Sequence, residues 1–260
     1  MHPDLSEWLN LVVRWFHVFA GILWIGQTFL FTWMDRTLDR EQSLWLVHSG
    51  GFYIVERQRV PQALPQTLHW FRWEAAMTWL SGMTLLIILY YLGGLMDTQS
   101  LGGVAISLLL SFVLLAAAWV AYDSLWQSPV ARNEFAAAIV SFILLVAVIF
   151  GLTHLMTGRA AYIHIGSMLG TFMTANVWVR ILPFQRQMVA AVKKGIPPDI
   201  SLGARAKQRT KHNSYMVVTV VFIMISNHFP VATYGNPYNW AVLSVLTIVG
   251  GVAAKVLRSR

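Results

Sequence analysis

The sequence contains no cysteine, and this absence excludes several kinds of site. Disulfide bonds, thiolate metal sites, iron–sulfur clusters and a covalently attached c-type haem all need cysteine side chains, and the 260 residues include none. Charge is also scarce, since Asp, Glu, Lys and Arg make up 12% of the chain whereas hydrophobic residues make up 57%. A soluble domain rarely has this balance. The composition therefore predicts an integral membrane protein.

Long apolar runs predict an all-α bundle of about seven transmembrane helices in a single domain, residues 1–260. A helix needs about 20 mostly apolar residues to cross the hydrocarbon core of a bilayer. The N-terminus lacks the basic segment of a cleavable signal peptide, so we expect the first run to remain as a span. The expected spans are 8–33, 70–95, 103–122, 135–157, 160–182, 213–231 and 238–257. Residues 34–69 and 183–212 are expected to be cytoplasmic loops, the second with at most a short surface helix.

The distribution of basic residues orients this bundle. Seventeen of the 19 Lys and Arg residues fall on one side once the seven spans are drawn. By the positive-inside rule, the N-terminus is external and the C-terminus cytoplasmic, as in a multi-pass protein of a bacterial inner membrane. The net charge of +8 is therefore a topology signal that also suits anionic lipid, and it does not indicate nucleic-acid binding. Gly166 and Gly170 form a G-x-x-x-G pair, which predicts close helix packing.

Four histidines on four different spans are expected in the outer half of the membrane. They are His17, His154, His164 and His228. Imidazoles in hydrocarbon need partners, so these side chains should face the bundle interior. Ligation of a non-covalent haem b iron is one explanation, because a helical bundle can supply facing axial ligands. Hydrogen-bonded packing histidines, a non-haem metal site and a proton relay are the alternatives.

Two arginines and three further histidines complete the candidate sites. Arg14 stands one turn before His17 and predicts an anion partner, either a substrate, a haem propionate or an acidic side chain, unless it reaches the interface. Arg159 adds positive charge at the same outer mouth or is an ordinary loop residue. His48, His69 and His212 lie on the inner side, where they form a second haem or substrate site or make interfacial hydrogen bonds.

An ordered series of distinctive segments runs along nearly the whole chain. The segments are WFHVFAGILWIG at 15–26, HSGGFY at 48–53, LHWFRWEA at 68–75, WLSG at 79–82, GRAAYIHIG at 158–166, ANV at 175–177, PP at 197–198, KQR at 207–209, HN at 212–213 and SNHFP at 226–230. This series resembles the membrane domain of the bacterial membrane-bound, cytochrome-linked urate oxidases, also called urate hydroxylases. The family's usual architecture adds a further span and a c-type cytochrome domain with a Cys-x-x-Cys-His motif, which this sequence does not contain.

The resemblance implies oxidation of urate to 5-hydroxyisourate, with water as the oxygen source. Electrons would pass through haem b to cytochrome c or to a quinone. Two other functions remain open at this point. One is a haem-bearing electron-transfer or anchor subunit without substrate chemistry of its own, and the other is a purine transporter. Little in the sequence favours the transporter, because no pair of Gly- or Pro-broken spans lies in corresponding halves.

Overall fold

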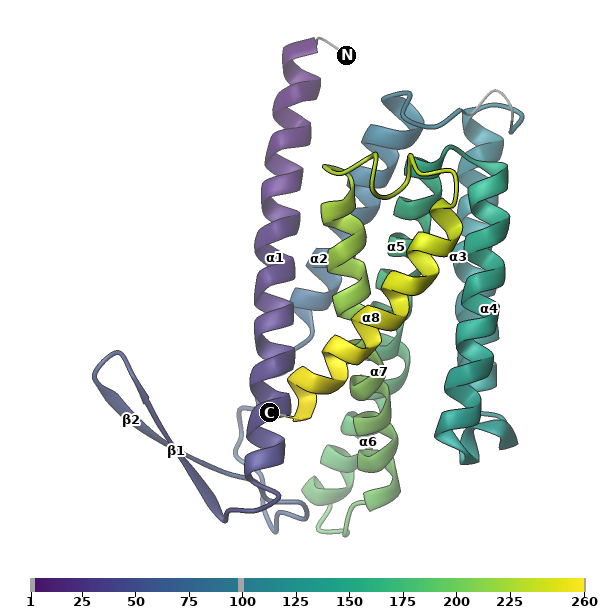
Figure 1. Ribbon diagram of the computed structural model, residues 1–260. Helices are drawn as coiled ribbons and strands as arrows, with labels where there is room; N and C mark the ends of the chain where they lie inside the picture. Colours follow the sequence, from purple (N-terminus) through teal and green to yellow (C-terminus); the bar gives the residue numbers. More distant parts are fainter. Residues whose placement is uncertain (1–2, 98–100, 260) are drawn as a thin grey trace.

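The computed structural model describes residues 3–97 and 101–259, which form a helical bundle with one small β-hairpin (Figure 1). The helices run antiparallel or steeply inclined to one another, and helix α1 stands at one side. The elements in chain order are α1 (Pro3–Thr37), β1 (Ser43–His48), β2 (Gly51–Glu56), α2 (Trp73–Leu86) with a π-helical end (Ile87–Leu92), α3 (Val104–Leu125), a 3-10 turn (Pro129–Arg132), α4 (Glu134–Leu155), α5 (Gly158–Ala175) with a π-helical segment (Asn176–Ile181), α6 (Leu182–Lys193), α7 (Ile200–Ser226) and α8 (Asn239–Ser259).

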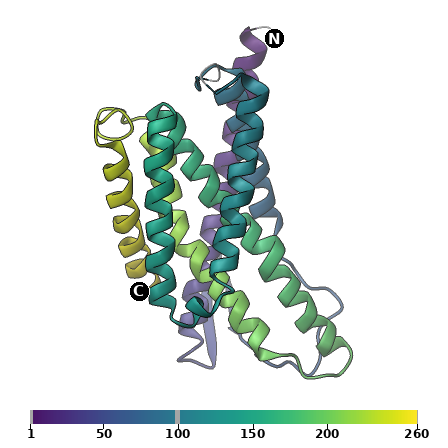
Figure 2. The same cartoon turned by 90° about the vertical axis from the view of Figure 1, so that its right-hand side faces the viewer.

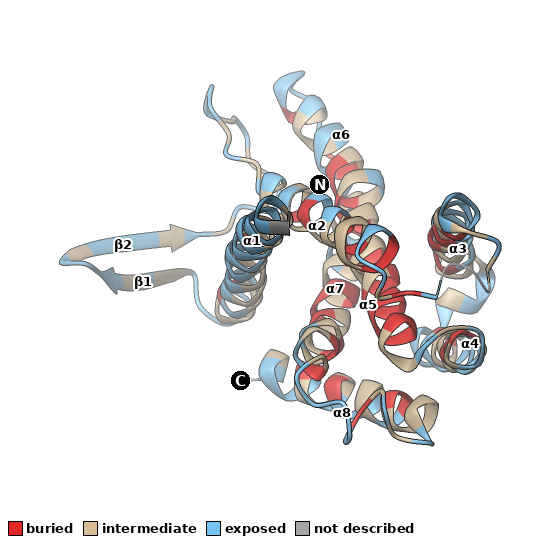
Figure 3. Ribbon diagram, turned by 90° about the horizontal axis from the view of Figure 1, so that it is seen from above, coloured by how far each residue is buried: buried red, intermediate tan, exposed pale blue. Residues whose placement is uncertain are grey.

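Five of these helices are long and apolar enough to cross a membrane. They are α1, α2 with its π-helical end, α3, α4 and α8. The other two expected spans correspond to α5 and α7, which lie in the middle of the bundle (Figure 3). Helix α5 carries most of its buried residues between Ala160 and Met173. Central helices touch other helices rather than lipid, so they tolerate polar side chains that lower their hydropathy.

Side-chain caps define where several helices begin. The Asn133 side chain accepts hydrogen bonds from the backbone N–H groups of Phe135 and Ala136, and Thr157 accepts one from Ala160. Asp199 caps α7 through the N–H of Ser201, at 2.8 Å. Asn, Thr and Asp are preferred at this position because they satisfy N–H groups that have no partner within the helix. The cap at Asp199 starts α7 well before the apolar run of that helix.

The expected loop 183–212 and the expected start of the span that follows it both differ from the structure. Residues 183–212 are largely helical, because α6 continues from the end of α5 and α7 begins at Ile200 (Figure 2). The expected span 213–231 is therefore the second part of a longer helix, which ends at Ser226. Hydropathy detects the apolar part of a helix but not a polar extension beyond the bilayer. This extension, the hairpin and residues 126–133 lie at the same end of the bundle (Figure 1). We call it the basic end.

The segment 34–69 is not a plain loop, because it contains the β-hairpin, so the fold is not purely α-helical. Strands β1 and β2 are antiparallel, with Trp45 opposite Ile54 and Val47 opposite Phe52. Ser49 and Gly50 both have positive φ angles, 49° and 79°. Two such residues make the tight turn whose twist suits a hairpin, and glycine adopts it without strain.

Packing between α5 and α7 confirms one half of the predicted glycine pair. A Cβ atom on Gly166 would lie 3.0 Å from Ile223 Cγ2 and from Met224 Cε, so the two helices approach closely there. A Cβ atom on Gly170 would meet nothing within 4 Å. The expectation for Gly170 is therefore wrong, because this part of α5 does not press against a neighbouring backbone.

Candidate functional site

The most buried of the four outer histidines is His164, which is completely inaccessible on α5. Its Nδ1 lies 2.7 Å from the carbonyl oxygen of Ala160, and its Nε2 lies 2.8 Å from the Tyr91 hydroxyl and 3.0 Å from Ser111 Oγ. Because a carbonyl only accepts, Nδ1 carries the proton and Nε2 accepts from a hydroxyl. His164 thus has a hydrogen-bond partner at both ring nitrogens.

His17 is half-buried between α1 and α2. Its Nδ1 lies 2.9 Å from the carbonyl oxygen of Thr78 and 3.0 Å from Ser81 Oγ. A Cβ atom on Gly82 would lie 2.9 Å from His17 Cε1, so the glycine makes room for the ring. The contact with the Thr78 carbonyl directs Nε2 away from the backbone, as in many metal-ligating histidines.

The structure does not bring the four outer histidines together. His17 contacts α2 at Thr78 and Ser81, whereas His164 contacts Tyr91, about 15 Å further along α2 at 1.5 Å per residue. His154 and His228 are exposed. Within the described ranges, no hydrogen bond or ring contact joins any two of the four, and no group of three or more His, Asp or Glu residues suits a metal ion. Haem b binding by these histidines therefore stays a prediction.

The two predicted arginines lie at the opposite end from the basic end and have different partners. Arg159 Nε donates to Asn227 Oδ1 at 3.2 Å, and the Tyr90 hydroxyl donates to the same oxygen at 3.4 Å. Arg14 instead donates to Asn10 Oδ1 at 3.2 Å, one turn earlier on α1. Among the residues that the structure describes, neither arginine forms an ion pair with a carboxylate. This region is therefore positively charged, but its arginines are only partly buried or exposed.

The three inner histidines also separate. His48 is exposed at the end of β1, and His69 is exposed with its ring 4.5 Å from that of Phe71. His212 instead is buried in the bundle, where its Nδ1 lies 2.7 Å from the Tyr122 hydroxyl and its ring lies 3.9 Å from that of Trp126. The expectation of a site at His212 therefore leads to a real cluster, but without His48 or His69.

Tyr122 belongs to a buried polar network that joins α3, α7 and the π-helical end of α5. The Asn176 amide donates to the Tyr122 hydroxyl at 3.1 Å and to Asn213 Oδ1 at 2.9 Å. Asn213 in turn donates to the carbonyl of Met173 at 3.0 Å. Because Asn176 donates to its oxygen, the Tyr122 hydroxyl is free to donate its own proton to His212 Nδ1.

Arg209 connects this network to a buried carboxylate. The guanidinium of Arg209 is 4% exposed, donates to Asn176 Oδ1 at 3.3 Å and lies over the ring of Tyr122. Its NH2 also pairs with Asp123 Oδ1 at 2.8 Å. Arg180 binds both oxygens of the same carboxylate, and Gln127 donates to it as well. Asp123 thus fixes two arginines in place and is fully hydrogen-bonded.

A pocket of about 450 Å³ opens beside this network at the basic end. This volume lies within the range of about 300 to 1,000 Å³ that is usual for small-molecule sites. Four arginines, two glutamines and two aromatic rings form much of its wall. These residues are Arg132, Arg180, Arg205, Arg209, Gln127, Gln208, Trp126 and Phe184.

The pocket carries a strong positive charge. Asp123 neutralises part of the charge of Arg180 and Arg209. In the described part of the chain, Arg132 and Arg205 have no ion pair with a carboxylate, and Arg205 lies 4.5 Å above the ring of Phe184. Guanidinium groups bind planar anions with paired hydrogen bonds, and aromatic faces stack on flat rings. The arrangement suits a flat organic anion.

Sequence reasoning missed the residues that build this pocket, although one signal was present. Asp123 follows directly on the apolar run 103–122, and a carboxylate at such a position points to a functional or ion-paired residue. In the sequence, Arg180 and Arg205 indicate only topology, and Arg209 indicates topology and lies in the KQR segment of the resemblance. Their convergence depends on the helical extension formed by α6 and the first part of α7, which hydropathy does not predict.

The sequence matches the model of a protein family. A family model described as Urate oxidase N-terminal matches residues 3–260, nearly the whole chain. No curated protein matches the sequence, and no solved structure matches the fold.

Proposed function

This chain belongs to the Urate oxidase N-terminal family, and from that membership we propose that it is a membrane-bound oxidoreductase that converts urate to 5-hydroxyisourate. The family match indicates a urate-oxidase-like function. Five helices that are able to cross a membrane fit an enzyme of the bacterial inner membrane. We propose seven spans with the N-terminus external, so that the basic end faces the cytoplasm.

The reaction needs water and an electron acceptor. A water oxygen bonds to C5 of urate, two protons leave, and two electrons pass to an acceptor. We propose that this acceptor is cytochrome c, which takes one electron per molecule, or a membrane quinone, which takes two electrons and two protons. Either acceptor is a separate molecule and is not part of this chain.

The observation that carries the proposal is the four-arginine pocket. Urate is a planar anion at neutral pH whose edges carry carbonyl oxygens and ring N–H groups. Among the described residues, Arg132 and Arg205 form no ion pair with a carboxylate. The amide groups of Gln127 and Gln208 donate to Asp123 and Glu134, and their side-chain oxygens are available as acceptors. Trp126 and Phe184 offer flat apolar faces. We place urate between these side chains.

His212 and Tyr122 do not line the pocket but lie next to its wall. The His212 ring is 3.9 Å from the ring of Trp126, which lines the pocket. Since Tyr122 donates to His212 Nδ1, the imidazole is held in one orientation, as a general base requires. Asn176 and Arg209 hold the tyrosine in place. We propose that the Tyr122 hydroxyl takes up a proton released when water adds to urate and passes its own proton to His212 Nδ1. The imidazole is neutral beforehand, because burial and the nearby Arg209 lower the pKa of His212 to about 3.

Substitution of the unpaired pocket arginines tests this placement. We expect Arg205→Gln and Arg132→Gln each to raise the KM for urate about tenfold or more, because a hydrogen bond to a charged group contributes about 1.5 to 3 kcal/mol. Arg186→Gln is the matched control, since Arg186 is exposed on α6 and does not line the pocket. Unchanged KM in both pocket variants would place urate elsewhere, with the Arg14 and Arg159 region the next candidate. Urate flux into vesicles without redox change would instead indicate a transporter.

A further inference from the structure

The β-hairpin has no protein partner on most of its surface. Trp45, Val47, Phe52 and Ile54 lie on one face of the strand pair, and each is between 56% and 73% exposed. Tyr53, on the other face, is 52% exposed. An isolated two-stranded hairpin is at best marginally stable in water. These large apolar side chains therefore need an apolar environment that removes them from water.

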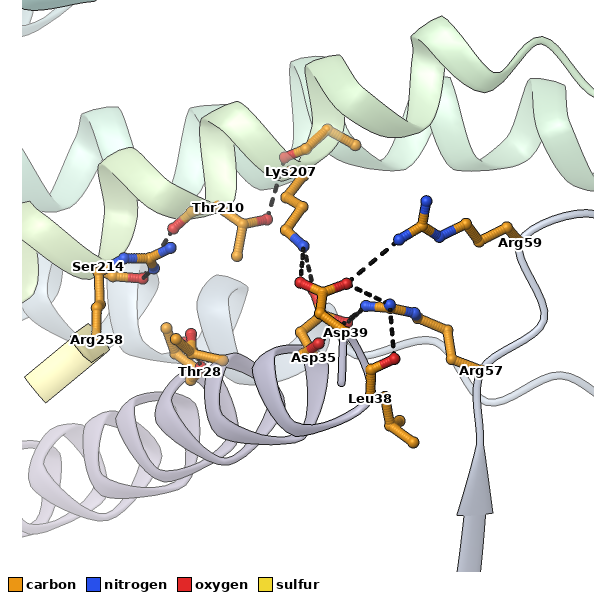
Figure 4. Close-up of polar contacts among 12 residues, drawn as sticks. Thr28, Asp35, Leu38, Asp39, Arg57, Arg59, Lys207, Thr210, Ser214 and Arg258 are labelled. Carbon is orange, nitrogen blue, oxygen red and sulfur yellow. Dashed lines mark hydrogen bonds and ion pairs between the residues drawn. The ribbon is translucent and has the colours of Figure 1, made fainter. Parts of the chain in front are cut away.

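A polar network fixes the base of the hairpin to the end of α1 (Figure 4). Arg57, which directly follows β2, donates to the carbonyls of Asp35 and Leu38 and pairs with Asp39. Lys207 on α7 lies 3.4 Å from Asp35 Oδ2. The hairpin is thus held at a set position relative to two helices and does not hang on a free loop.

That position is near a membrane surface. Helix α1 has 35 residues, a length of roughly 52 Å, so it exceeds a hydrocarbon core of about 30 Å and its ends reach the interfaces. Near its end, Phe31 and Trp33 are both 41% exposed, as expected for aromatic anchors at the interface. The hairpin starts six residues after α1 ends, and it projects sideways past α1, away from the other helices (Figures 1 and 3).

We propose that the hairpin lies in the interface of the bilayer leaflet at the basic end, with Trp45, Val47, Phe52 and Ile54 buried against the acyl chains. The apolar hairpin surface would continue the lipid-facing surface of α1. The unpaired N–H and C=O groups along both strand edges exclude the hydrocarbon core, but headgroups and interfacial water satisfy them. The hairpin would act as a lateral anchor that holds α1 upright beside the bundle.

Site-directed spin labelling tests this directly, because the chain has no native cysteine. A nitroxide is attached to Val47→Cys in protein reconstituted into nanodiscs of zwitterionic and anionic phospholipid. Collision rates with oxygen, which concentrates in lipid, and with a water-soluble nickel chelate are then compared. We expect the oxygen-to-nickel ratio at Val47→Cys to be several-fold higher than at Lys194→Cys, an exposed position in the turn between α6 and α7. Leu23→Cys, exposed on α1, provides the lipid reference.

Two results would overturn the proposal. A ratio at Val47→Cys equal to that at Lys194→Cys would place the hairpin in water. Each chain carries a single label, so dipolar coupling between two labels would show that a second copy of the chain covers the hairpin instead. Phe52→Cys, opposite Val47 on the same face of the strand pair, repeats the measurement independently of any local disturbance at Val47.

Discussion

At the scale of single residues, Asp123 holds the candidate site together. Its side chain is 10% exposed and binds Arg180, Arg209 and Gln127. A buried ion pair contributes little net stability, because desolvation offsets the attraction, but removal of one partner leaves an uncompensated charge. The carboxylate is thus a positioning residue for two pocket arginines.

We therefore expect Asp123→Asn to destabilise the protein by about 3 to 5 kcal/mol, as measured by thermal unfolding in detergent. Asp39→Asn is the control, because the side chain of Asp39 is 44% exposed and its ion pairs should contribute about 1 kcal/mol or less. Equal losses in the two variants would show that the Asp123 pairs are no more important than surface ones.

Tyr122→Phe separates the proposed proton path from binding. The variant keeps the ring that stacks on Phe172 but removes the hydroxyl that His212 contacts. We expect kcat for urate oxidation to fall about 100-fold, the lower end of general acid–base effects, with little change in KM. A change in KM alone would contradict a role in proton transfer, and the pH profile of kcat gives an independent reading.

At the scale of elements, the contact between α5 and α7 decides whether a glycine is required. A Cβ atom at Gly166 would press on Ile223 and Met224, so Gly166→Ala should cost about 1 to 3 kcal/mol through overpacking. Gly170→Ala meets open space in the same helix and should be neutral or stabilising by about 0.4 to 1 kcal/mol. Stability is measured from unfolding curves of the two variants. Coinciding curves would contradict the close contact at Gly166.

The sequence predicts the helices well but not the hairpin or the pocket, and the reasons are physical. Each of the seven apolar runs lies mostly within a helix, because the bilayer requires hydrophobic length and the chain shows it directly. The hairpin was missed although Ser49 and Gly50 stand between two apolar stretches, a usual turn signal. The pocket could not be predicted, since Asp123 on α3 and Arg209 on α7 meet only when both helices pack around α5 and its π-helical segment.

At the scale of the whole molecule, the ion pairs at the end of α1 join the hairpin to the bundle. The hydrogen bond from Arg57 lowers the pKa of Asp39, with smaller effects from Lys207 and Arg59. A carboxyl whose pKa is lowered by folding stabilises the folded state fully above its ordinary pKa of about 3.9. That stabilisation is lost as the pH falls through the lowered value.

We therefore expect a spin label at Val47→Cys to gain mobility only in acid, below about pH 4. The spectrum should stay unchanged from neutral pH down to that range. In Asp39→Asn, which cannot titrate, mobility should be raised at every pH. A transition near pH 6 would instead point to a histidine, and would contradict the role given to Asp39.

The most direct test of the proposed function is urate turnover by the purified protein in ¹⁸O-labelled water, with ferricytochrome c or a short-chain quinone as acceptor. The proposal predicts that each urate consumed reduces two ferricytochromes or one quinone, that the 5-hydroxyisourate carries ¹⁸O, and that no hydrogen peroxide forms. Arg205→Gln should need more urate for the same rate, whereas Arg186→Gln should not. Release of one hydrogen peroxide per urate with O₂ as the oxidant, or no urate oxidation with either acceptor, would contradict the proposal.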